Sequence, residues 1–458
     1  MGARLLCVDR VLVLMARQRS TLLVVCLISL ATLWSCRLPR MCLFDQCNAD
    51  ITAGPLAHKS VDLSRPDSPF IGWPLERVCK ETRWTPGVVF VCDNNSGGIG
   101  NIRNFILTCL RYGIEAGATA LVLPQIRTRS AADLSSILHE YRDFDYFFDA
   151  EHFREGLQAS CPQITIYNTT HDIPNTTHEP FQAERITPRD FGRRGGCDQR
   201  ELNKHSDRFG SRFRAWLQET AAQFSLQPPS LKHPRVIRLN WGVQWDWPVY
   251  RDGPEFVATY GGLLKLRADI LELGKKTATH MRQFAAEQDQ KTASASYAGM
   301  HLRTESDALS GWPRFENQSS AYLERASNAG LKAAYLATGN KTEAEKLVRS
   351  AISYHGIGMA TKHMLLKGHP GDLNALEALT WDQQALVDFV VLLESDYFLG
   401  VSPSSFSLNV ALKRHLLMEG LYTRPWKVGT ESDGRSWLIG NYEAYWDDWL
   451  FMFDSLWP

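Results

Sequence analysis

The sequence predicts an α/β protein with two doubly wound, Rossmann-like domains that face each other across a cleft. Three observations support this fold class. A strand, a glycine turn, a helix and a second strand follow one another between residues 87 and 124. A second alternating block of strands and helices starts near residue 297, and an uncharged run at residues 21–34 precedes both blocks. Because parallel strands need a helical crossover, the two blocks predict two parallel sheets.

The first block opens with the stretch GVVFVCDNNSGGIGNIRNF. Residues 87–92 are apolar and β-branched, which is typical of a buried strand, and residues 101–116 carry apolar side chains at helical spacing. The turn between them holds Gly98 and Gly100. It lies at the carboxyl end of a strand and the amino end of a helix, where α/β proteins bind anionic ligands. A glycine turn that only allows close packing is the alternative interpretation.

The amino terminus predicts a membrane anchor. Residues 21–34 are uncharged and arginines flank the run, but the run is shorter than the roughly 20 residues that span an average bilayer. We expect a cytosolic tail at residues 1–20, a signal anchor at 21–36 and a stem at 37–86; a cleaved signal peptide is the alternative. The protein would then be a single-pass type II protein of the Golgi or endoplasmic reticulum membrane, with a lumenal body.

Sequons, cysteines and charge agree with a lumenal body. Five N-x-[ST] triplets begin at Asn94, Asn168, Asn175, Asn317 and Asn340. The cysteines stop at Cys197, so we expect one or more disulfides in the amino-terminal half. Lysine plus arginine and aspartate plus glutamate both number 50, and this balance argues against a nucleic-acid partner.

Composition and periodicity divide the rest of the chain into three parts. We expect residues 87–290 to form the first Rossmann-like domain and residues 291–430 to form the second. Residues 431–458 are dense in aromatic side chains and are expected to pack on both domains. Two such domains enclose a cleft, which is the usual place of a small-molecule site.

Polar residues follow the first strand of the second domain, in the segment YAGMHLRTESD. His301, Arg303 and Asp307 stand at the carboxyl end of this strand. An arginine there can bind a diphosphate bidentately and stabilise the charge on a departing nucleotide. Asp307 either orients Arg303 or takes a proton as general base. An ordinary ion pair at a strand end is the alternative.

The third segment combines a helix, a short strand and a serine-rich turn that opens another helix. Asp388 lies in the first helix, and Ser404, Ser405 and Phe406 follow the strand. The two serines fall where a helix is capped, and hydroxyl groups and free N–H groups at a helix start suit a phosphate. Plain helix capping is the alternative.

Together the three segments resemble the GDP-fucose protein O-fucosyltransferases in order and spacing, over roughly residues 87–420. The resemblance implies a GT-B fold, a GDP-fucose donor, Ser/Thr acceptors, inversion at the anomeric carbon and no cofactor or metal. It also implies that the first domain lies on the acceptor side and that the second binds the nucleotide. It implies that Arg303 holds the diphosphate, with His301 beside the nucleotide and Asp388 helping to hold it. Ser404, Ser405 and Phe406 would complete the donor pocket together with the turn at Gly98 and Gly100, and Asn101 would approach the sugar and the acceptor.

Two departures leave alternatives open. No carboxylate lies between residues 94 and 104, so the general base is Asp93, Asp307 or none, with the departing diphosphate taking the proton. Because the loop lacks a carboxylate, a non-catalytic lumenal protein that binds a glycan or a partner is also an alternative interpretation. A transferase with another nucleotide sugar or a glycan acceptor is a further alternative. The Asp143-Phe144-Asp145 triplet, a pattern of metal-dependent glycosyltransferases, is interpreted as a turn beside aromatic residues.

Overall fold

The computed structural model describes residues 61–130, 133, 136–176, 183–187, 209–240, 247, 249–289, 293–308, 312–416, 428–431, 433–441, 443 and 455–458. These residues all belong to one compact unit that covers residues 60–458. The expected cytosolic tail, signal anchor and first part of the stem lie outside the described residues. Within the described residues, none of the helices is both long enough and apolar enough to span a bilayer.

The first sheet is parallel and has the strand order β5-β2-β1-β7-β6. Its strands are β1 (Thr85–Val91), β2 (Ala118–Val122), β5 (Thr165–Tyr167), β6 (Glu184–Ile186) and β7 (Arg235–Leu239). The run from Gly87 to Val91 is buried, as expected for a central strand covered on both faces. The structure therefore confirms the predicted strand, helix and strand around the glycine turn, with α3 (Ile99–Ala116) as the crossover.

The second sheet is also parallel, with the order β10-β9-β8-β11-β12. Its strands are β8 (Ala298–His301), β9 (Ala333–Ala337), β10 (Gly358–Ala360), β11 (Tyr397–Val401) and β12 (Ser436–Ile439). Helices α8 (Phe315–Asn328), α9 (Lys341–Ser350), α10 (Lys362–Leu366), α11 (Pro370–Ala378), α12 (Trp381–Leu393) and α13 (Ser405–His415) connect or follow these strands. The α/β prediction with two parallel sheets is confirmed. We call the part around each sheet a lobe.

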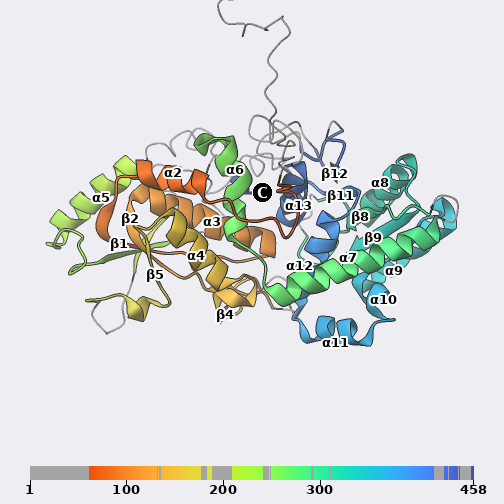
Figure 1. The fold of residues 1–458 in the computed structure, drawn as a ribbon, viewed down its shortest axis with the longest axis horizontal. Coiled ribbons are helices and arrows are strands. Elements are labelled where there is room, and N and C mark those ends of the chain that lie inside the picture. Colours follow the sequence, from red (N-terminus) through yellow and green to blue (C-terminus); the bar gives the residue numbers. More distant parts are fainter. Residues whose placement is uncertain are drawn as a thin grey trace, which may run out of the picture. The chain divides into compact units, whose positions relative to one another are not determined.

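The elements divide between the lobes differently from the predicted ranges. The predicted range of the first domain includes the long helix α7 (Ala268–Gln288), yet this helix packs on α12, α10 and β9 of the second lobe (Figure 1). Strand β12 lies inside the range predicted as an aromatic tail, and it pairs with β11. The sequence boundary at residue 290 follows a change in composition, whereas the packing boundary precedes α7.

The last residues before the first sheet are folded, although the sequence predicts a stem up to residue 86. Helix α2 (Trp73–Glu81) packs on α4 (Ala150–Ser160) and α6 (Pro254–Tyr260), and a disulfide joins Cys79 of α2 to Cys161. A second disulfide joins Cys92 to Cys109 of α3. The expected disulfides in the amino-terminal half are thus confirmed. Two short strands, β3 (Ile126–Arg127) and β4 (Tyr141–Arg142), form a separate hairpin, and α5 (Phe209–Gln223) packs on α3.

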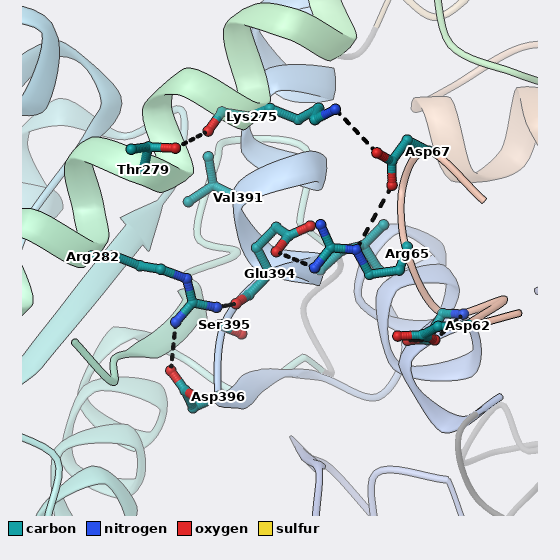
Figure 2. A network of polar contacts seen from close by, with 12 residues as sticks. Asp62, Arg65, Asp67, Lys275, Thr279, Arg282, Val391, Glu394, Ser395 and Asp396 are labelled. Atoms are coloured by element: carbon teal, nitrogen blue, oxygen red, sulfur yellow. Dashed lines mark hydrogen bonds and ion pairs between the residues drawn. The ribbon is translucent and has the colours of Figure 1, made fainter. Parts of the chain in front are cut away.

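The segment just before α2 is fixed to the second lobe by charged contacts (Figure 2). Arg65 lies 3.0 Å from the Glu394 carboxylate, and Asp67 lies 3.0 Å from Lys275 of α7. Because α2 itself packs on the first lobe, this segment connects the two lobes. At the other end of the described chain, Trp457 is fully buried against Phe256 and Tyr260 of the first lobe.

Candidate active site

A cleft of about 970 Å³ collects residues from both lobes. All but one of the site residues predicted from the sequence line it: Gly98, Asn101, His301, Arg303, Asp307, Asp388, Ser404, Ser405 and Phe406. The exception, Gly100, faces a neighbouring cavity of about 40 Å³ between the lobes. Three segments far apart in the sequence therefore converge on one cleft.

Two helices begin at this cleft. Helix α3 starts after Gly98 and α13 starts after Ser404; neither capping residue makes a side-chain hydrogen bond to its helix, and neither first turn holds an acidic residue. Among the described residues, no acceptor is bonded to the backbone N–H groups of Ser405 and Phe406. Both helix starts present partial positive charge to the cleft, which favours an anion.

The two glycines of the turn have different structural roles. A Cβ on Gly100 would lie 2.7 Å from the carbonyl carbon of Ser405, so this glycine allows the starts of α3 and α13 to touch. A Cβ on Gly98 would meet nothing within 4 Å, and the backbone angles of Gly98 (φ −78°, ψ 165°) suit any residue. The fold therefore requires glycine at position 100 but not at position 98.

Arg303 is held in place by two carboxylates and a glutamine. Its guanidinium lies 2.6 Å from Glu305 and 2.8 Å from Asp307. The buried Gln318 accepts from the N–H of Arg303 and donates to its carbonyl oxygen, both at 2.9 Å. Burial alone would lower the pKa of Arg303, but the carboxylates of Glu305 and Asp307 outweigh it and the pKa is raised. Arg303 is a permanent cation whose backbone and side chain are both fixed.

Asp307 also binds a second arginine that the sequence did not single out. Nη1 of Arg129, which follows β3 in the first lobe, lies 2.5 Å from Oδ2 of Asp307, while Oδ1 of Asp307 accepts from Arg303. Burial would raise the pKa of Asp307, but the two arginines outweigh it and the pKa is lowered. A carboxylate that is stabilised in this way is a weak base.

His301 is a neutral, buried side chain at the end of β8. Burial lowers its pKa to about 4. Its Nδ1 lies 2.7 Å from Oγ of Ser407, and the ring centroid lies 4.6 Å from that of Phe406. The Ser407 oxygen also accepts from the N–H of Val401 at 3.1 Å, so Ser407 connects the His301 ring to the end of β11.

Asp388 lies on α12, where the cleft is lined by a second buried ion pair. One carboxylate oxygen is 2.6 Å from Nζ of Lys362, and the other accepts from the Tyr335 hydroxyl at 2.5 Å. Asp388 and Lys362 both line the cleft and are almost fully buried. The resemblance implies that Asp388 helps to hold a nucleotide; in the structure both of its oxygens already have protein partners.

The other candidate residues lie elsewhere. Asp93 is paired with Arg238 and is not among the residues that line the cleft. The triplet Asp143-Phe144-Asp145 enters a short 3-10 turn whose Phe144 is buried, which confirms the interpretation as a turn. In the part of the chain that the structure describes, no group of His, Cys, Asp or Glu side chains is arranged to hold a metal ion.

Comparison with known proteins gives a family match. Residues 89–417 match the model of the GDP-fucose protein O-fucosyltransferase family. A search of curated protein sequences found no match.

Solved structures that are similar include POFUT1 in complex with GDP-fucose, with 14% identity, 78% of this chain and 99% of that chain covered, and a TM-score of 0.45. Another is a point mutant of Arabidopsis thaliana FUT1 in complex with GDP (11% identity, 74% and 72% covered, TM-score 0.36). The fucosyltransferase NodZ from Bradyrhizobium is a third, with 16% identity, 72% and 92% covered, and a TM-score of 0.36.

Proposed function

Because this chain belongs to the GDP-fucose protein O-fucosyltransferase family and is a GDP-fucose-dependent fucosyltransferase, we propose that it transfers fucose to a Ser or Thr hydroxyl of a protein, with inversion at the anomeric carbon. The observation that carries the proposal is the convergence of Arg303 and the starts of α3 and α13 on one cleft.

The diphosphate of the donor binds to Arg303 and to the N–H groups at the start of α13. Arg303 provides a planar, permanently charged group with fixed geometry, and the first turn of α13 provides N–H donors aimed at the same cleft. Both interactions strengthen as negative charge develops on the departing GDP, so they stabilise the transition state more than the bound donor. His301 and Phe406, which are in contact, form a wall of the donor pocket.

In this mechanism the proton of the acceptor leaves with GDP. The hydroxyl oxygen of the acceptor bonds to the anomeric carbon of fucose, the bond from this carbon to the β-phosphate oxygen breaks, and the hydroxyl proton passes to the diphosphate. This choice is supported by the carboxylates near the cleft: Asp307 is held by two arginines and Asp93 is paired with Arg238 outside the cleft. Asp307 then orients Arg303, and Asn101 positions the sugar and the acceptor from the facing lobe.

No metal or cofactor takes part in the proposed reaction, because Arg303 and the helix starts neutralise the leaving group. We further propose that the protein works in the lumen of the Golgi or endoplasmic reticulum, with residues 21–36 as its membrane anchor. The disulfides Cys79–Cys161 and Cys92–Cys109 support an oxidising compartment.

Calorimetric titration of the full-length protein in detergent with GDP tests the donor site. We expect saturable binding that Arg303→Ala weakens by about 100-fold, since two charge-assisted hydrogen bonds to phosphate are lost. The matched control is Arg154→Ala on α4, an arginine that bonds to Asn168 and is not among the residues that line the cleft. Equal GDP affinity in the native protein and Arg303→Ala would refute the proposed donor site. GDP binding without fucose transfer to any Ser/Thr peptide or protein would favour the non-catalytic alternative.

A further inference from the structure

Arg303 and the two carboxylates that hold it have a net negative charge, which is unfavourable for binding a diphosphate. Arg303 lies within 2.8 Å of two carboxylates, Glu305 and Asp307. Burial works against ionisation of both acids, but Arg303 outweighs it and the pKa of each is lowered, so both are charged at neutral pH. One guanidinium and two carboxylates give a net charge of −1. Such a group repels the diphosphate of a nucleotide sugar, which carries about two negative charges.

Arg129 of the first lobe restores the balance. It lines the same cleft as Arg303 and pairs with Asp307, from which it is separated by 178 residues in the sequence. Its side chain is 12% exposed, so water screens the interaction little. Its Nε is buried and has no hydrogen-bond partner among the described residues. Arg129 therefore has a donor group that its pair with Asp307 leaves unused.

On the basis of the proposed function, we propose that Arg129 is a second guanidinium of the diphosphate site, supplied by the opposite lobe. The donor diphosphate competes with Asp307 for Arg129 and is bound between Arg129 and Arg303. Asp307 positions both arginines while the donor is absent, which keeps them from pairing with other groups. Donor binding then depends on contact between the lobes, because Arg303, Glu305 and Asp307 without Arg129 have a net charge of −1.

Substitutions change the net charge beside the diphosphate site stepwise. The four side chains Arg129, Arg303, Glu305 and Asp307 have a net charge of zero. Arg129→Met changes this to −1, and the double variant Arg129→Met with Asp307→Asn returns it to zero. If Arg129 acts through its charge on the diphosphate, the second substitution restores part of the GDP affinity that the first removes. If Arg129 only fixes the structure, loss of Asp307 restores nothing.

The test is calorimetric titration of the full-length protein with GDP at two salt concentrations. We expect Arg129→Met to weaken GDP binding by about 10- to 100-fold, as for the loss of a charge-assisted hydrogen bond. Arg129→Lys should retain most of the affinity, and the double variant should bind GDP at least threefold more tightly than Arg129→Met. The matched control is Arg127→Met in the same hairpin. Arg127 bonds to the Tyr141 hydroxyl at 2.9 Å and is not among the residues that line the cleft.

The GDP affinities of these variants distinguish a role of Arg129 in binding the diphosphate from a purely structural role. GDP affinity of Arg129→Met within twofold of the native value overturns the proposal. A loss that Arg129→Lys shares in full, or that Asp307→Asn does not relieve, overturns it as well, because the role would then be structural. Failure of the native protein to bind GDP at all would instead remove the proposed function and the inference with it. Retained binding in the native protein and in Arg127→Met separates that failure from the others.

Discussion

The contact between the starts of α3 and α13 makes a sharp prediction for two neighbouring glycines. Gly100→Ala places a Cβ 2.7 Å from the carbonyl carbon of Ser405 and 2.8 Å from its oxygen. Ordinary van der Waals contacts begin near 3.4 Å, so one helix start has to move by about 0.7 Å. Gly98→Ala places its Cβ in open space beside the cleft. The two substitutions are two positions apart in one turn. Gly100→Ala should mainly lower stability, whereas Gly98→Ala should mainly weaken GDP binding.

The expected size of the Gly100→Ala effect follows from two opposing contributions. Overpacking costs about 1–3 kcal/mol, and replacing glycine by alanine in a helix returns about 0.5–1 kcal/mol. The free energy of unfolding should fall by about 1.3 kcal/mol, the difference between the midpoints of these two ranges. An unfolding entropy of about 2.1 cal/mol/K per residue over the roughly 400 residues of the compact unit converts this to a fall in Tm of about 2 °C. GDP affinity should also fall, because the displaced residue Ser405 begins α13.

Scanning fluorimetry and GDP titration on both variants provide the assay. Gly98→Ala should lower Tm by about 1 °C or less, since alanine is a poorer N-cap than glycine but its methyl group meets no atom of the fold. It should weaken GDP binding by about three- to tenfold, because the methyl group occupies space in the cleft that the donor uses. The reasoning is refuted if Gly98→Ala lowers Tm as much as Gly100→Ala does. It is also refuted if Gly100→Ala has native Tm and native GDP affinity.

Four further predictions concern the site and the fold. Arg303→Lys keeps the charge but loses the planar, bidentate geometry, so the fucose transfer rate should fall at least 100-fold while Tm stays within about 1 °C of the native value. A nearly native transfer rate would show that the positive charge alone is sufficient. Burial lowers the pKa of His301 to about 4 from its ordinary 6.5, so at intermediate pH the unfolded chain binds a proton that the native state does not. The free energy of unfolding should therefore fall by up to about 3 kcal/mol as the pH is lowered from 6.5 to 4. His301→Gln should flatten this slope in urea titrations, and an unchanged slope would contradict the assignment. Serine at both Cys79 and Cys161, which are 82 residues apart, should lower the free energy of unfolding by about 2–4 kcal/mol in urea titrations; native stability would show that the disulfide constrains little. EDTA should leave the transfer rate unchanged, and a loss that a divalent metal restores would contradict the metal-free mechanism.

Local sequence patterns predicted the two sheets and the strands next to the site. Strands were predicted at residues 87–92 and 297–303, and the structure has β1 and β8 there with boundaries shifted by up to two residues. The lobe of α7 was not predictable in this way. Its amphipathic pattern gives a helix, but the choice of α12 as a partner comes from tertiary packing, which no local period encodes.

The difference between local patterns and tertiary packing also explains which cleft residues could be predicted from the sequence. Arg303 and Ser404 stand directly after strands, and the carboxyl ends of parallel strands meet at one edge of a sheet. Arg129 has no such signal, because it lies in an irregular segment. Lys362 does follow a strand, but β10 (Gly358–Ala360) has only three residues and was not predicted from the sequence. Their partners, Asp307 and Asp388, are 178 and 26 residues away, and only the folded chain brings them together.

A crystal structure of the protein with GDP tests the central claim most directly. We predict that the diphosphate lies in the cleft, with its oxygens within about 3 Å of the Arg303 guanidinium and of the N–H groups of Ser405 or Phe406. A nucleotide bound elsewhere, or one whose diphosphate contacts neither Arg303 nor the start of α13, would contradict the account.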